Sequence, residues 1–193
     1  MNSTDLKPTF IKIKIKDADV FLENLGKGKG KITISSLNYG SFNFFWGSMG
    51  SNLEEFILSI NSDYFASKLS TKSYTFDPKG STKSLRKHIR EELSYDLPYY
   101  KFMTAQKEMR KAIKKLEFVS SADEFISRMI DIPDNLMCFD LNHQEEKEFK
   151  SIIRGLFFEP WHFISEKHSK EYDWLYGFHK ELKKHLKSNK ILN

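Results

Sequence analysis

Histidine is the residue type in this sequence that is best able to bind a metal ion or to transfer a proton near neutral pH. Four of the six histidines fall in the C-terminal part of the chain: His162, His168, His179 and His185. They form two pairs that are each six residues apart, whereas helical zinc ligands are commonly four residues apart, so that both rings lie on one face. The spacing favours histidines that are exposed or partly packed, and it predicts no zinc site.

A second chemical pattern, Pro133-Asp134 followed by Glu145-Glu146-Lys147, resembles that of the PD-ExK nucleases. In those enzymes acidic side chains hold magnesium, and a lysine helps to orient the attacking water. The nuclease family carries its E-x-K residues on a strand, but here they open an amphipathic helical pattern, where acidic residues favour the helix N-terminus. A PD-ExK-like nuclease is therefore kept only as a remote alternative.

The segment Gly26-Lys27-Gly28-Lys29-Gly30 has the small and basic residues of a phosphate-binding loop. It lacks the G-x-x-x-x-G-K-[ST] spacing that surrounds a nucleotide with backbone amides and a lysine. We expect a solvated, flexible basic loop whose lysines could touch RNA or an acidic protein surface.

Ser, Cys and His form no nucleophile elbow or triad pattern, so the sequence predicts no catalytic residue, no metal and no cofactor.

Basic residues that recur at helical spacing are the strongest signal for binding. In the pattern near residues 103–116, five basic side chains fall within about 140° of the helix surface, opposite an apolar face. The candidate binding residues are Lys83, Arg86, Lys87 and Arg90 in a first stripe, Lys107, Arg110, Lys111, Lys114 and Lys115 in a second, and Lys180, Lys183, Lys184 and Lys187 in a third. Such stripes attract phosphates or an acidic protein surface, and ordinary solvated helix faces are the alternative.

Charge is distributed unevenly along the chain, whose formal net charge is +5. Residues 83–115 contain ten Lys and Arg against four Asp and Glu, whereas residues 117–149 contain two against nine. This segregation predicts separate basic and acidic faces, although a composition typical of genomes poor in G and C accounts for part of the basic excess. No aromatic segment matches an RNA-stacking signature such as the RRM motif, so specific base recognition is not indicated.

Length and composition indicate one folded cytoplasmic protein. A chain of 193 residues with 39% hydrophobic residues can bury a sizeable core. The N-terminal residues lack the features of a signal peptide, and no apolar run approaches the roughly 18 residues of a membrane span, so we expect no membrane contact. Cys138 lies in an apolar run and is expected to be a buried thiol.

Hydrophobic periodicity predicts an α+β fold. Strict alternation over residues 11–16 indicates a half-buried antiparallel strand, and Asp17 is expected to cap a short helix that ends near Leu25. Residues 31–37 and 41–46 indicate a hairpin with an aromatic face made of Phe42, Phe44 and Trp46, which one or two short helices follow.

The turn residues Pro78-Lys79-Gly80 mark the best candidate boundary, and every pattern beyond them is helical. We therefore predict a small antiparallel sheet with one or two helices in residues 1–78, followed by a mainly helical subdomain in residues 79–193. The two parts are expected to pack together as one unit.

Residues 39–50 read Tyr-Gly-Ser-Phe-Asn-Phe-Phe-Trp-Gly-Ser-Met-Gly, and Glu55-Phe56-Ile57 and Asp63-Tyr64-Phe65 follow them. This order resembles a family of small uncharacterised bacteriophage and prophage proteins over about residues 31–69, with the helical part after Pro78 outside the resemblance. The family brings no established chemistry to transfer. Core packing is the favoured role of Phe42, Phe44 and Trp46. A structural role is expected for the motif residues Tyr39, Gly40, Trp46, Gly47 and Gly50.

A phage origin implies a small, non-enzymatic protein that disables host machinery in the bacterial cytoplasm. The size, charge segregation and A/T-rich composition look like those of an anti-CRISPR inhibitor, and a type VI RNA-guided ribonuclease is one target that this likeness implies. The expected partner is a host protein or nucleoprotein effector, with RNA contact as an added feature. A basic nucleic-acid-binding accessory protein of a phage is the alternative.

Overall fold

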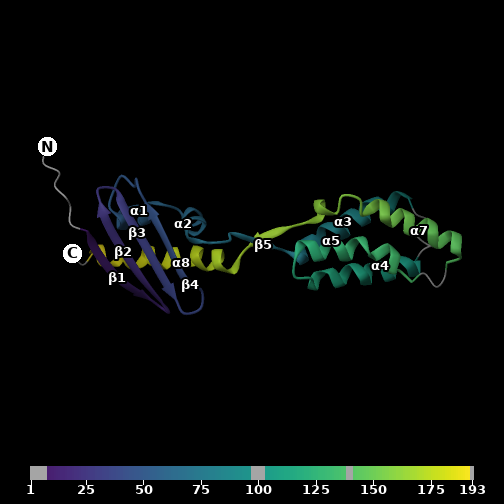
Figure 1. Cartoon of the computed structure of the whole chain (residues 1–193), viewed down its shortest axis with the longest axis horizontal. Coiled ribbons are helices and arrows are strands. Elements are labelled where there is room, and N and C mark those ends of the chain that lie inside the picture. The colour runs from purple at the N-terminus through teal and green to yellow at the C-terminus, as the bar shows by residue number, and fades with distance from the viewer. Residues whose placement is uncertain (1–7, 97–102, 138–140, 192–193) are drawn as a thin grey trace. The chain divides into compact units, whose positions relative to one another are not determined.

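The computed structural model describes residues 8–96, 103–137 and 141–191 of the chain. It divides into two compact units, which we call unit 1 (Met1–Tyr74 with His168–Asn193) and unit 2 (Thr75–Lys167). Figure 1 shows that strands from the N-terminal part and the helix from the C-terminal part belong together in unit 1, whereas unit 2 is helical. The predicted α+β class is confirmed.

Unit 1 is built from a meander of four strands and three helices. Its elements are β1 (Thr9–Ile15), β2 (Ala18–Gly26), β3 (Lys29–Ser36), β4 (Gly40–Trp46), α1 (Leu53–Ser59), α2 (Ser62–Leu69) and α8 (Lys170–Ile191). The strands pair antiparallel in the order β1-β2-β3-β4, so β2 and β3 are central. Tight turns between consecutive strands explain this order, because they leave no room for a crossover.

The alternation of the strands places one apolar side of the sheet in the core. Ile13 and Ile15 of β1 point to this side and are buried, as the strand prediction for residues 11–16 requires, whereas Ile11 is 37% exposed. Lys12 and Lys14, which alternate with these isoleucines, are exposed. Phe42 and Trp46 of β4 are also buried and Phe44 is partly buried, so the aromatic face of the hairpin packs in the core.

The prediction of a helix over residues 17–25 was wrong, because this segment forms strand β2. Val20 and Leu22 alternate with outward residues, and β2 is paired on both sides, which outweighs the local helical tendency of a short segment. Asp17 lies in the turn before β2 and accepts hydrogen bonds from the side chains of Asn38 and Ser36 instead of capping a helix.

The loop expected over residues 26–30 is also shorter than predicted, since β2 ends at Gly26 and β3 begins at Lys29. Gly28 occupies the turn with φ +67°, a backbone region that favours glycine. Gly30 is within β3, where an added Cβ would lie 3.1 Å from the Glu23 carbonyl oxygen and 3.1 Å from Leu53 Cβ. Gly28 therefore allows the tight turn between β2 and β3, and Gly30 allows close packing within the sheet. Both have a structural role in the hairpin rather than a role in a phosphate-binding loop.

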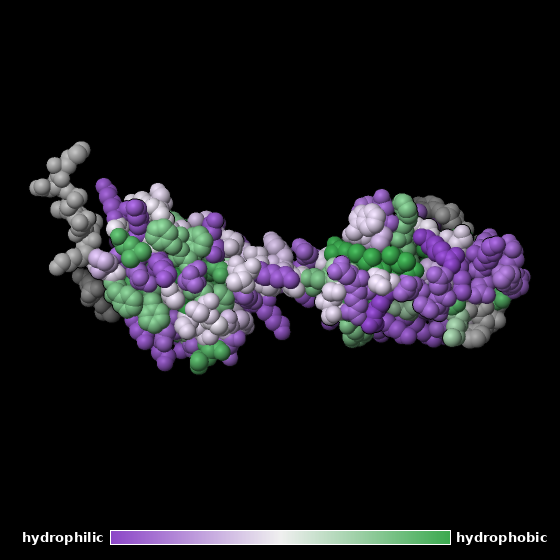
Figure 2. Space-filling view, viewed as in Figure 1, coloured by the Kyte–Doolittle hydropathy of each residue, from purple (hydrophilic) through white to green (hydrophobic). Residues whose placement is uncertain are grey.

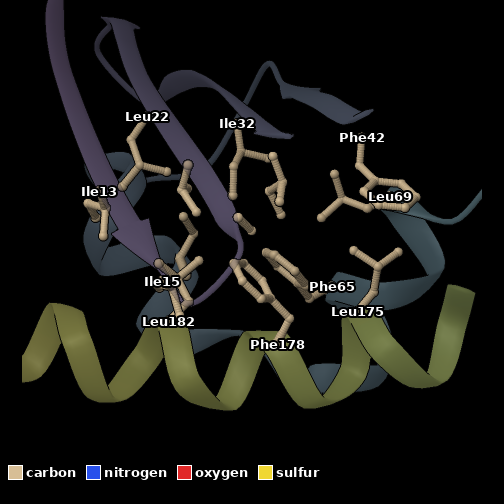
Figure 3. Packing of buried hydrophobic residues seen from close by; sticks show 14 of the residues in the cluster. Ile13, Ile15, Leu22, Ile32, Phe42, Phe65, Leu69, Leu175, Phe178 and Leu182 are labelled. Carbon is tan, nitrogen blue, oxygen red and sulfur yellow. The ribbon is translucent and has the colours of Figure 1, made fainter. Parts of the chain in front are cut away.

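Helix α8 completes the core of unit 1 although it lies at the other end of the sequence. Leu175, Phe178 and Leu182 are buried on its inward face, and Figure 3 shows them directed at side chains from the sheet and from α2. The predicted boundary near residue 78 separated this helix from the sheet, but the contacts place it in unit 1. The physical reason is that the apolar stripe of α8 covers the apolar side of the sheet, which would otherwise be exposed.

Unit 2 is a helical assembly with its own core. Its helices are α3 (Pro78–Asp96), α4 (Met103–Lys115), α5 (Ala122–Ile130), α6 (Ile132–Asn135) and α7 (His143–Leu156), with 3-10 turns η1 (Leu116–Phe118) and η2 (Pro160–Phe163). Two short strands, β5 (Tyr74–Phe76) and β6 (Glu166–His168), pair at the points where the chain enters and leaves this unit. Within the described residues, no helix is both long and apolar enough to cross a membrane.

His179 of α8 is completely buried, contrary to the expectation of an exposed or partly packed histidine. Its ring stacks on Phe65 with a centroid separation of 4.3 Å, and Nε2 donates to the Ile57 carbonyl oxygen at 3.0 Å. Because a carbonyl oxygen can only accept, Nε2 carries the proton of the neutral ring, and Nδ1 accepts from the Ser62 hydroxyl at 3.0 Å. Burial lowers the pKa of His179 to about 4, so the neutral ring is the stable form in the fold.

We predict that Leu182→Ala lowers the free energy of unfolding of unit 1 by about 2–5 kcal/mol, because it removes a fully buried side chain between α8 and the sheet. Lys184→Ala, at an exposed position of the same helix, should change it by no more than about 0.5 kcal/mol. Urea denaturation followed by tryptophan fluorescence measures both. Equal effects of the two substitutions would contradict the packing of α8 on the sheet.

We also predict that unit 1 loses stability as the pH falls from about 6.5 towards 4. The unfolded histidine binds a proton in this window and the folded one does not, so the loss reaches about 3 kcal/mol at the lower end. A His179→Gln variant, which does not titrate, should show a much weaker dependence in urea denaturation at matched pH values. An NMR titration that gives His179 a pKa near 6.5 would refute the explanation.

Candidate functional site

The first two basic stripes meet at one groove in unit 2. The groove lies between α3 and α4 and has a volume of about 720 Å³. Its lining residues are Arg86, Ile89 and Arg90 of α3, with Gln106, Lys107, Met109, Arg110, Lys111, Ile113 and Lys114 of α4. Six of the residues that sequence spacing selected as candidates thus line a common site.

The groove combines an apolar floor with a cationic rim. Ile89, Met109 and Ile113 lie at the floor, where they are at most 6% exposed and belong to the core of unit 2. The basic side chains stand around them, and long Lys and Arg stems add further apolar surface below their charged ends. Gln106 is also buried here, and sequence reasoning missed it because a single glutamine in an amphipathic pattern carries no signal of its own.

Part of the cationic rim is neutralised within the fold. Arg86 pairs with Glu117 at 2.9 Å, and Lys111 pairs with Glu108 at 2.6 Å. By contrast, four exposed rim residues form no ion pair with any residue that the structure describes; they are Arg90, Lys107, Arg110 and Lys114. Within the described part of the chain, no carboxylate neutralises these four charges.

A second, shallower hollow of about 610 Å³ extends the basic surface along α3. Lys83 and Lys87 line it, and it shares Arg86 and Arg90 with the groove. Lys87 lies 3.8 Å from Glu91, an exposed contact of little energetic weight. Lys115 is exposed at the end of α4 but does not line the groove.

The third stripe belongs to α8 in unit 1, so it does not contribute to this groove. Lys180 lies over the ring of Tyr176 at 4.3 Å, Lys184 pairs with Glu181 at 3.2 Å, and Lys187 is exposed.

Lys183 is directed into unit 1, where Nζ donates to the Ile60 carbonyl oxygen at 2.6 Å. Burial lowers its pKa, and the nearby charge of Lys187 adds to this shift. Lys183 and His179 therefore both bind backbone carbonyls of the α1–α2 region, which is a structural role.

The residues of the aromatic motif pack and shape unit 1. Tyr39 stacks on Trp174 of α8 at 4.8 Å, and the Trp46 indole donates to the Tyr64 hydroxyl at 3.3 Å. Gly40 and Gly50 have φ values of +84° and +77°, which favour glycine. Gly47 lies against the ring of Phe45, where an added Cβ would come within 3.4 Å of the ring.

The residues of the nuclease-like pattern have partners in the helical fold. Asp134 forms an ion pair with Arg154, and Glu146 pairs with Lys150 at 2.7 Å. Glu145 accepts from the backbone of Asn142 in the capping box that begins α7. The helical context expected for the E-x-K residues is therefore confirmed, and the pattern has a structural explanation.

No site for a metal ion emerges from the residues that the structure describes, since they contain no suitable group of three or more His, Cys, Asp or Glu. His162 and His168 are exposed and each lies near a carboxylate, Glu159 at 3.4 Å and Asp173 at 3.7 Å. The predicted buried thiol, Cys138, lies outside the described residues.

We predict that Lys183→Met lowers the free energy of unfolding by about 1 kcal/mol, because the Ile60 carbonyl oxygen loses its donor. Lys180→Met removes the same charge from an exposed position and should leave stability unchanged within about 0.5 kcal/mol. Thermal unfolding of the two variants compares them directly. A stability of Lys183→Met equal to that of the unchanged protein would show that this hydrogen bond is dispensable.

Comparison with known proteins extends the resemblance seen in the aromatic motif. A family model described as a phage family matches residues 3–188, so the match includes the helices after Pro78 that the motif alone had left outside. No curated protein and no solved structure matches the chain. Because the family match covers nearly the whole sequence, including the groove-forming helices, the chain belongs to this phage family.

Proposed function

We propose that the protein is a phage-encoded, non-enzymatic inhibitor that binds a host defence effector through the α3–α4 groove and blocks it stoichiometrically. The observation that carries this proposal is the convergence of two basic stripes on one apolar-floored groove. Membership of a phage family supports a host-directed role, because phage genes are expressed inside the infected cell.

The chemistry of the groove favours an acidic, amphipathic protein segment as its occupant. Apolar side chains of such a segment would pack against the aliphatic stems of the rim Lys and Arg residues above Ile89, Met109 and Ile113, as in helix-in-groove recognition. Asp and Glu on its flanks would meet Arg90, Lys107 and the other free cations of the rim. The apolar contacts would supply most of the affinity, and the charges would direct orientation and speed of association.

The same features make nucleic acid a poorer occupant of this groove. A phosphate backbone would use the rim but would gain nothing from burying the apolar floor. Among the groove-lining residues that the structure describes, none carries an aromatic ring on which a base could stack. A protein partner uses both parts of the site, so we place the inhibitor proposal above that of a basic nucleic-acid-binding accessory protein.

The proposal extends to a class of host defence effector. An anti-CRISPR role against a type VI RNA-guided ribonuclease is one form that it can take, since such an effector is a large protein with acidic as well as basic surfaces. The proposed site of action is the cytoplasm of the bacterial host.

The decisive experiment is affinity capture from the host with ribonuclease treatment, followed by titration of the purified partner. We expect a protein that is retained at moderate salt and inhibited at a saturating ratio near one copy per effector. The double charge reversal Arg110→Glu with Lys114→Glu should weaken binding by roughly tenfold or more. As a control, Lys180→Glu with Lys187→Glu makes the same change of net charge on α8, away from the groove residues, and should leave affinity within about twofold.

Three outcomes would overturn the proposal. Recovery of nucleic acid with no retained protein would favour the accessory-protein alternative. A partner that binds the groove variant as tightly as the unchanged protein would exclude this groove. Cleavage of RNA or DNA with magnesium or manganese that is lost in Asp134→Ala or Glu145→Ala would establish a nuclease instead.

A further inference from the structure

The side of the sheet that faces away from the core carries exposed aromatic rings. Phe10 of β1 is 62% exposed and Phe45 of β4 is 51% exposed, and Phe21 of β2 is half-buried between them. Burial of large aromatic side chains is normally favourable, so a group of exposed phenylalanines on one sheet face needs an explanation. Figure 2 shows hydrophobic residues lying among hydrophilic ones on the visible surface of this unit.

Strand register places these rings in two adjacent rows. In the first row, Phe10 of β1 pairs with Glu23 of β2. Glu23 pairs in turn with Lys31 of β3, and Lys31 pairs with Phe45 of β4. This row therefore has a phenylalanine at each edge of the sheet. Three strand spacings separate the ends, a distance of roughly 14 Å. In the neighbouring row Lys12 lies opposite Phe21.

The rings are held in place by their surroundings. Phe10 and Phe21 contact each other with centroids 5.8 Å apart, and Lys12 Nζ lies 5.3 Å from the Phe21 centroid. Phe45 rests against Gly47, whose missing side chain leaves space for the ring. Phe10 and Phe45 are therefore held on the sheet while more than half of each side chain stays exposed, so stacking on them would cost little conformational entropy.

The charges around the rings are mainly positive. Lysines occupy four outward positions of the strands: Lys12, Lys14, Lys29 and Lys31. Two carboxylates, Asp19 and Glu23, share the same side, and Asp19 lies 3.8 Å from Lys12 in an exposed contact. The face thus offers cations between aromatic rings, in contrast to the groove, where cations surround an aliphatic floor.

We infer that the outer face of the sheet binds single-stranded nucleic acid without base specificity. About two or three bases would stack on the phenylalanine rings, and phosphates would pass over Lys12 and Lys31, which lie in the same two rows. Every base has a flat aromatic face, so this arrangement requires no sequence motif and accepts RNA or DNA. An apolar protein surface would use the rings but would leave the interleaved lysines desolvated. The inference is independent of the groove and of its partner.

Fluorescence anisotropy of labelled oligouridylate and oligothymidylate, each of about 12 nucleotides, tests this site in the full-length protein. We expect both to bind, with an affinity that falls as salt rises. The double substitution Phe10→Ala with Phe45→Ala should weaken binding by roughly tenfold or more, whereas Phe10→Tyr with Phe45→Tyr keeps the rings and should bind within about threefold of the unchanged protein.

Two controls distinguish this face from other parts of the molecule. Leu37→Ala removes an exposed hydrophobic side chain from a turn of the same unit and should not affect binding. Arg110→Gln with Lys114→Gln alters the groove with a smaller change of charge and should weaken binding less than Phe10→Ala with Phe45→Ala does. Circular dichroism and thermal unfolding check that every variant is folded.

Absence of binding by the unchanged protein at moderate salt would overturn the inference. Equal binding by the alanine and tyrosine variants would also overturn it, because stacking would then contribute nothing. If the alanine variant instead abolishes a concentration-dependent dimer seen by sedimentation, the face is an interface with a second copy of the chain. Tighter binding of oligouridylate would identify RNA as the preferred ligand, and tighter binding of oligothymidylate would identify DNA. Either preference supports the inference.

Discussion

The packing of α8 against the sheet joins the two ends of the sequence in one hydrophobic core. Leu175 and Leu182 fill the space beneath the strands, while His179 and Lys183 bind the backbone where α1 gives way to α2. These contacts link residues more than a hundred positions apart, so formation of unit 1 closes the intervening chain into a long loop at an entropic cost. The helices of unit 2 occupy that intervening segment, with β5 and β6 paired where it begins and ends.

This arrangement explains why buried polar groups occur in unit 1. The Ile57 and Ile60 carbonyl oxygens lie near the end of a short helix, where intrahelical donors run out. A neutral histidine and a lysine on α8 supply the missing donors, and burial lowers the pKa of each. The α1–α2 connection and the last helix are therefore specified together, because neither satisfies its polar groups without the other.

Both proposed binding surfaces are positively charged, but their charges surround different kinds of apolar group. In unit 2, an aliphatic floor surrounded by Arg and Lys suits a partner that is apolar at its centre and acidic at its edges. In unit 1, rings alternate with lysines on a pleated surface, which suits planar bases joined by phosphates. A nucleoprotein target would present both kinds of partner chemistry.

Local patterns in the sequence determined the α+β class, most strands and helices, the helical context of Glu145, and the two basic stripes that later line the groove. These features depend on side-chain period and on neighbours within one or two turns, so the sequence carries them directly. The tertiary structure decided the strand at residues 18–26, the membership of α8 in the sheet unit, the burial of His179 and the placing of Phe10, Phe21 and Phe45 on one face. Each of these depends on contacts between segments far apart in the chain, whose pairing and packing energies outweigh local preference and leave no short-range pattern.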